Sequence, residues 1–94
     1  MLTHIVFLRF SSIDIAKEAK EKLLSMEGKI PVLKSIEVGI DIVRSARSWD
    51  LALLTRFEDK AGLDAYGVDP VHKQVATFLR AHAKEIAAVD YISD

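Results

Sequence analysis

The sequence contains no cysteine, which excludes disulfide cross-links, thiolate metal sites and cysteine nucleophiles. It also contains no apolar run close to the roughly 18 residues that a membrane-spanning helix needs. Only two prolines and four glycines occur, and they are not clustered, so we find no linker, repeat or low-complexity region. These absences predict a single domain over residues 1–94.

The chain has almost no excess of charge of either sign. It carries 13 Lys and Arg residues against 14 Asp and Glu residues, which gives a net charge of −1. A nucleic-acid-binding protein usually carries a basic excess, so we expect no nucleic-acid partner. Half of the residues are apolar and 29% are charged, as in a globular protein. The first residues lack a basic leader, so we expect no signal peptide, no membrane attachment and a cytoplasmic location.

Strand and helix patterns alternate along the chain. Alternating apolar residues predict four strands, at residues 2–10, 33–43, 49–57 and 86–92. Apolar residues at helical spacing predict a helix after Ser12, a short helix over residues 59–66 and a further helix from Asp69 to about His82. The order is β-α-β-β-α-β with a broken second helix. It predicts an α+β, ferredoxin-like protomer, in which helices cover one face of a four-stranded antiparallel sheet.

The first and third predicted strands are apolar on both faces. An antiparallel sheet with helices on one face usually has polar side chains on the other. A large apolar side chain left in water forfeits about 1.5–3 kcal/mol of burial, so something must cover the second face. A second copy of the same sheet is the simplest cover and predicts a homodimeric α/β barrel. We assign five residues to this interface: Ile5, Phe7, Leu51, Leu53 and Phe57.

Several segments, taken in order, resemble the stress-responsive dimeric α/β-barrel domain family. The resemblance covers nearly the whole chain and rests on residues 4–10, Gly39, residues 49–53, Phe57, residues 66–72 and residues 89–91. It implies a homodimer, as the two apolar strand faces already suggest. The family includes many members of unassigned function and a plant polyketide cyclase, olivetolic acid cyclase, to which the chain has a distant similarity.

The resemblance also implies candidate site residues. In the cyclase, a histidine and a tyrosine between sheet and helices carry out an aldol-type ring closure. Its Tyr-x-x-His-Pro-x-His segment is similar to residues 66–72, with Asp69 in place of the first histidine. The resemblance therefore places Tyr66, His72 and His4 at the catalytic positions. With the strand face that carries His4, the candidate ligand pocket contains His4, Val6, Leu8, Tyr66, Asp69 and His72.

The chemistry of these residues leaves alternatives open. A neutral imidazole at His72 can take a proton from carbon next to a carbonyl, and Tyr66 can donate a hydrogen bond to the resulting enolate oxygen. The same two residues can also form a buried pair that only fixes the loop. We expect a stress-responsive barrel protein that binds a small apolar or aromatic molecule. The alternatives are a cofactor-independent cyclase-like or monooxygenase-like enzyme and a structural oligomer without catalysis.

The sequence predicts neither a metal site nor a cofactor. Asp69 and His72 are three residues apart and His4 could lie near them, but three ligands without defined geometry are not a motif. No glycine-rich phosphate loop or Ser-His-Asp order occurs. Asp50, at the start of a predicted strand, is expected to bond neighbouring backbone amides.

Overall fold

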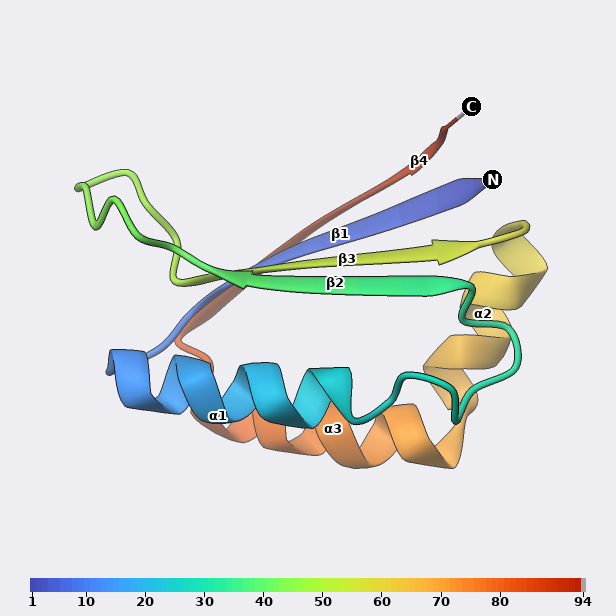
Figure 1. The fold of residues 1–94 in the computed structure, drawn as a ribbon, viewed down its shortest axis with the longest axis horizontal. Coiled ribbons are helices and arrows are strands. Elements are labelled where there is room, and N and C mark those ends of the chain that lie inside the picture. The colour runs from blue at the N-terminus through green and yellow to red at the C-terminus, as the bar shows by residue number, and fades with distance from the viewer. Residues whose placement is uncertain (94) are drawn as a thin grey trace.

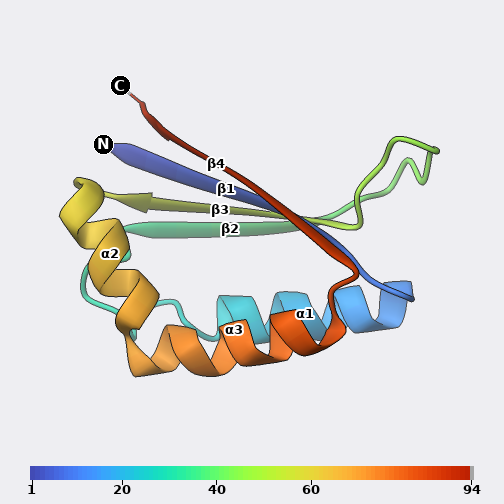
Figure 2. The same ribbon diagram turned by 180° about the vertical axis from the view of Figure 1, so that it is seen from behind.

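The computed structural model, which describes residues 1–93, is a four-stranded sheet with three helices on one face (Figures 1 and 2). The strands are antiparallel and lie in the order β2-β3-β1-β4. This confirms the ferredoxin-like α+β fold. None of the helices in residues 1–93 is long and apolar enough to cross a membrane. The elements are β1 (Leu2–Arg9), α1 (Ile13–Leu24), β2 (Ser35–Ile40), β3 (Leu51–Phe57), α2 (Lys60–Val68), α3 (Pro70–His82) and β4 (Glu85–Ile92).

Capping side chains fix where the helices begin. The Ser12 hydroxyl accepts a hydrogen bond from a backbone N–H in the first turn of α1, and Asp59 does the same for α2. Asp69 lies at the break between α2 and α3 that the sequence predicted. Its backbone is extended, its carboxylate accepts the Val71 N–H at 2.8 Å, and Pro70 follows as the first residue of α3.

The strand β2 is shorter than predicted. The pattern favoured residues 33–43, but the strand ends at Ile40, where the pairing with Leu51 also ends. Beyond it the chain forms a loop that projects past the end of the sheet (Figure 1), with Ile42 and Val43 exposed. The alternation of side chains continues into this loop without a strand to pair with, which is why periodicity alone overestimates the length.

The prediction that Leu51, Leu53 and Phe57 form the dimer interface is wrong. In the register of β1 and β3, Leu53 lies opposite Val6 and Leu51 lies opposite Leu8. Side chains directly opposite each other in an antiparallel pair point to the same face, and here that face is covered by the helices. The three residues are 1%, 3% and 0% exposed within the single protomer. The alternation separated the two faces of β3 correctly but did not show which one the helices cover.

The uncovered face of the sheet is nevertheless apolar. Ile5 and Phe7 lie on it, as predicted, opposite Leu54 and Ala52 of β3. Phe7 is 41% exposed, and Val89 on the neighbouring strand β4 is exposed as well. A continuous apolar surface therefore remains open on one side of the protomer.

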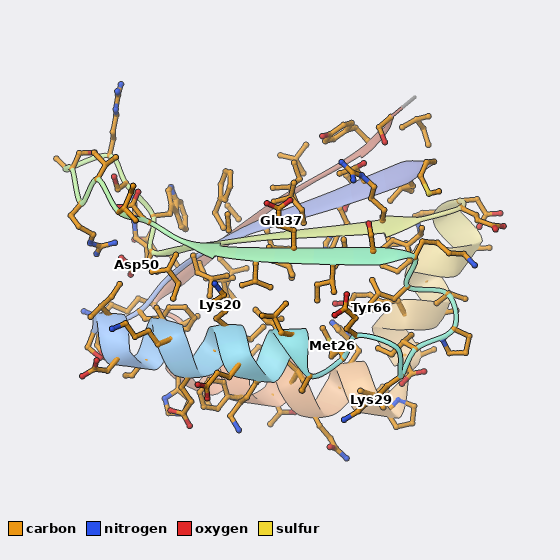
Figure 3. All side chains as sticks on the ribbon, viewed as in Figure 1. Lys20, Met26, Lys29, Glu37, Asp50 and Tyr66 are labelled. Atoms are coloured by element: carbon orange, nitrogen blue, oxygen red, sulfur yellow. The ribbon has the colours of Figure 1, made fainter. Side chains whose placement is uncertain are left out.

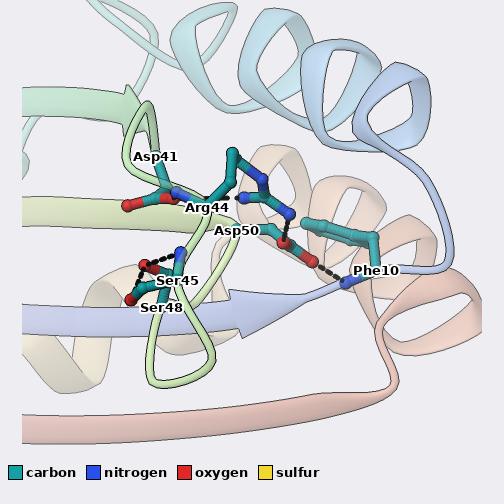
Figure 4. A network of polar contacts seen from close by, with 6 residues as sticks. All are labelled: Phe10, Asp41, Arg44, Ser45, Ser48 and Asp50. Carbon is teal, nitrogen blue, oxygen red and sulfur yellow. Dashed lines mark hydrogen bonds and ion pairs between the residues drawn. The ribbon is translucent and has the colours of Figure 1, made fainter.

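Asp50 connects the loop before β3 to the end of β1. Its carboxylate accepts the Phe10 backbone N–H at 2.7 Å and pairs with the Arg44 guanidinium at 2.6 Å (Figure 4). Burial alone would raise the pKa of Asp50, but the Phe10 amide and Arg44 outweigh it and hold the pKa below its usual value. The sequence predicted a bond to neighbouring backbone amides, but the amide that Asp50 accepts is that of Phe10, 40 residues away along the chain. Arg44, which adopts a left-handed backbone conformation with φ 56°, is a partner that the sequence did not show.

Candidate functional site

Three predicted site residues meet where the α2–α3 corner faces β1. His4 lies on the helix-covered side of β1, Tyr66 near the end of α2 and His72 in the first turn of α3. The ring centroids of Tyr66 and His72 are 4.1 Å apart, and those of Tyr66 and His4 are 6.5 Å apart. Figure 3 shows Tyr66 between the sheet and the helices, whereas Glu37 projects from the opposite face of the sheet.

The helix break is what brings Tyr66 and His72 together. On one continuous helix, residues six apart point in directions that differ by about 120°, so they would lie on different faces. The extended backbone of Asp69 ends α2 and lets α3 start in a new direction. Asp69 itself does not line any cavity found around this site, because its carboxylate caps α3. Its predicted place in the pocket is therefore corrected to a role in shaping the corner.

Two polar atoms at the centre of the site are buried and unpartnered. Tyr66 is 2% exposed and packs against Phe57 at 5.0 Å between ring centroids. Among residues 1–93, neither the Tyr66 hydroxyl nor His72 Nδ1 has a hydrogen-bond partner. Nearly all buried polar atoms in folded proteins have one, and each that lacks a partner costs about 1–3 kcal/mol. Tyr66 and His72 therefore each carry a hydrogen-bonding group that no residue in this range uses.

The surroundings keep both groups neutral. Burial lowers the pKa of His72, and the charges of His4 and Arg80 lower it further, while the Gly67 carbonyl and Asp69 act in the opposite direction. The imidazole is therefore uncharged at neutral pH. Burial also raises the pKa of the Tyr66 hydroxyl, which stays protonated. The pair thus offers an imidazole that can accept a proton and a hydroxyl that can donate a hydrogen bond.

Asp90 joins the site through His4. The two residues lie directly opposite each other on β1 and β4, and the Asp90 carboxylate is hydrogen-bonded to His4 Nδ1. This bond fixes the ring and leaves Nε2 as the nitrogen available to a ligand. Sequence reasoning missed this role of Asp90, since the register of β1 against β4 was not known. The alternation of side chains along β4 was the one sequence signal that could have suggested that Asp90 faces His4.

Two hollows share His4, Tyr66 and His72 in their walls. The inner hollow, of about 180 Å³, lies between the sheet and α3 and includes Val6 and Leu8, as predicted. The outer hollow, of about 550 Å³, opens beside the end of α2. Sequence reasoning missed the remaining lining residues of the inner hollow, which come mainly from α1, α3 and β4: Leu23, Leu53, Ala76, Leu79, Arg80 and Ile86.

No metal site is visible in this region. Within residues 1–93, no three His, Asp or Glu side chains are grouped so that they could hold a metal ion. The carboxylates of Asp69 and Asp90 are already bonded to a helix terminus and to His4. The chemistry that the arrangement offers is proton transfer and hydrogen bonding in an apolar cavity.

Comparison with known families identifies the fold family. The model of the stress responsive A/B barrel domain matches residues 2–93. The chain belongs to this family. None of the curated proteins matches it, so the similarity to a polyketide cyclase stays a prediction.

Solved structures support the same assignment. A dimeric ferredoxin-like protein of unknown function from Jannaschia sp. CCS1 is 29% identical, with a TM-score of 0.80 and 98% of each chain covered. A second such protein, from Bacteroides fragilis, is 25% identical, with a TM-score of 0.84, 96% of this chain and 93% of that chain covered. The hydroxynitrile lyase of Passiflora edulis shares the fold at 19% identity, with a TM-score of 0.85, 99% and 93% covered.

Proposed function

We propose that this family member binds a small apolar or aromatic molecule in the hollow between sheet and helices. The observation that carries the proposal is a pair of buried atoms without a hydrogen-bond partner, the Tyr66 hydroxyl and His72 Nδ1, on two residues that line a mainly apolar cavity. A carbonyl of the ligand can accept a hydrogen bond from the Tyr66 hydroxyl, a hydroxyl of the ligand can donate one to His72 Nδ1, and the apolar part is buried against Val6 and Leu8. Ligand sites typically combine an apolar lining with a few polar groups in this way.

Binding of acetophenone, a single-ring ketone, tests this proposal. A ligand at a hundredfold excess over its Kd stabilises a folded protein by about 2.7 kcal/mol, which a thermal melt detects readily. The ketone oxygen accepts a hydrogen bond from the Tyr66 hydroxyl, so in Tyr66→Phe we expect Kd to rise by about two- to tenfold, the value of one neutral hydrogen bond. Tyr91→Phe is the matched control, because Tyr91 lies opposite Thr3 on the uncovered face of the sheet, away from the hollow. Equal affinity in both variants, or no binding, would contradict the proposal.

A second candidate function is proton abstraction, and the neutral state of both groups favours it. The neutral His72 imidazole accepts a proton from the carbon beside a carbonyl, so that a C–H bond breaks and an N–H bond forms. The electron pair of the broken bond moves onto the carbonyl oxygen, where the Tyr66 hydroxyl donates a hydrogen bond to the developing charge. The existence of a lyase with this fold shows only that the scaffold can carry an enzyme.

Exchange of the acetophenone methyl protons in D₂O separates catalysis from binding. If His72 is the base, the wild-type protein accelerates exchange and His72→Asn loses about 10²–10⁴-fold of that acceleration. Tyr66→Phe should also be slower, because it removes the donor to the enolate oxygen. No acceleration by the wild-type protein, with binding still present, would leave a binding protein and exclude this reaction.

We also propose that the chain forms a homodimer through the uncovered face of the sheet. The face is apolar around Ile5, Phe7 and Leu54, and the similar proteins from Jannaschia and Bacteroides are described as dimeric. A hollow of about 340 Å³ beside Phe7 and Trp49 lies at one end of this face and offers room for side chains of a second copy. Burial of such side chains is the term that drives association.

Sedimentation analysis of a matched pair of variants tests the dimer. Phe7→Glu places a charge in the centre of the proposed interface and should give a folded monomer. Leu24→Glu places the same charge at the end of α1, in the helix layer, and should stay dimeric. A monomeric wild-type protein, or a dimeric Phe7→Glu, would contradict the assignment.

A further inference from the structure

The inner hollow has one permanently charged residue in its lining, Arg80. Of the eleven residues that surround it, all others are apolar or are His4, Tyr66 and His72. Arg80 follows His72 and Ala76 at four-residue intervals, so the three lie on one side of α3. Helix side chains lean toward the N-terminus of their helix, which directs the arginine toward His72.

Within residues 1–93, no carboxylate forms an ion pair or hydrogen bond with Arg80. Two acidic groups near the cavity already have partners. Asp90 is hydrogen-bonded to His4, and Asp64, in the outer hollow, forms an ion pair with Lys60 at 2.6 Å. Arg80 and His72 line the same hollow, and the arginine contributes to the lowered pKa of His72, as a nearby cation does. An unpaired guanidinium beside an apolar hollow is suited to a carboxylate, to which it can donate two parallel hydrogen bonds.

We propose that Arg80 binds a carboxylate group of the ligand, so that the cavity selects small apolar molecules that carry one negative charge. This inference rests on the proposed function of the cavity as a ligand site and adds the chemical class of the ligand. A volume of about 180 Å³ is smaller than the 300–1,000 Å³ of sites for drug-sized molecules, which restricts the apolar part to about one ring or a short chain. The carboxylate lies toward the end of α3, and the remaining part of the molecule points toward Tyr66 and His72.

A pair of nearly isosteric probes, 3-phenylpropionate and 3-phenylpropionamide, tests the inference by calorimetry at neutral pH and low salt. The two differ in charge but hardly in size or shape. We expect the wild-type protein to bind the carboxylate at least about tenfold more tightly than the amide, or about 1.4 kcal/mol. In Arg80→Gln this ratio should fall to about one while the amide affinity stays unchanged. Arg80→Lys, which keeps the charge without the planar fork, should retain part of the ratio.

Lys73→Gln is the matched control, since Lys73 is an exposed cation on the same helix outside the cavity lining. It should leave the ratio intact. A wild-type ratio near one, or an unchanged ratio in Arg80→Gln, would overturn the inference while amide binding still supported the proposed function. If Arg80→Gln lowers Tm without changing the ratio, the arginine only stabilises the C-terminal end of α3. If neither probe binds the wild-type protein, the ligand site itself is refuted.

Discussion

Replacement of Tyr66 by phenylalanine should make the ligand-free protein more stable. The hydroxyl is buried and has no hydrogen-bond partner among the described residues, so the folded state bears the cost of removing it from water. A group in this position costs about 1–3 kcal/mol, and phenylalanine removes the cost while it keeps the contact with Phe57. For a domain of this size, each kcal/mol corresponds to about 4–8 °C in Tm. We therefore expect Tm to rise by roughly 4–24 °C.

Thermal unfolding followed by circular dichroism measures this difference between the variant and the wild-type protein. The same Tyr66→Phe variant should gain less stability from acetophenone than the wild-type protein does, because the ligand loses one donor. A lower Tm for Tyr66→Phe would show that the hydroxyl stabilises the fold and would refute the reasoning that it is kept for a ligand.

Three further predictions concern the fold and the charges. Asp50→Asn should destabilise the protein at neutral pH but not in acid. The pKa of Asp50 is lowered in the folded protein, so the stabilisation by its carboxylate is present above the ordinary pKa of 3.8 and disappears as pH falls through the folded pKa. If the difference in Tm between Asp50→Asn and the wild-type protein stayed constant from neutral pH to acid, the carboxylate would not be the source of the stabilisation. Leu53→Ala should lower the free energy of unfolding in urea by about 2–5 kcal/mol, whereas Leu54→Ala on the uncovered face should lower it less and weaken association instead. The reverse order would place Leu53, and not Leu54, on the dimer interface. The NMR titration midpoint of His72 should lie below 6.5 and rise in Arg80→Gln. An unchanged midpoint would show that the charge of Arg80 does not affect the pKa of His72.

The order of the elements could be predicted from the sequence because each element carries its own signal. Alternation marked the strands, and Asp69 followed by Pro70 marked the helix break that divides α2 from α3. These are local signals, and they do not depend on which segment packs against which.

What could not be predicted depends on register and orientation. The two faces of β3 were separated, but both are apolar, so nothing in the sequence showed that the helices cover Leu53 rather than Leu54. The link between His4 and Asp90 requires the pairing of the first and last strands, which are 86 residues apart at this point. The sequence did not single out Arg80, because a cation on an amphipathic helix usually faces solvent. Its place in the cavity lining depends on how α3 packs on the sheet.

The central claim is that the hollow between His4, Tyr66 and His72 holds a small molecule. Two-dimensional NMR of the isotope-labelled protein, titrated with 3-phenylpropionamide, tests it most directly. We predict that the largest changes in chemical shift occur in residues 66–72 and at His4 and Asp90, with little change on the uncovered face around Trp49. Saturable changes confined to that uncovered face, or no changes at all, would contradict the claim.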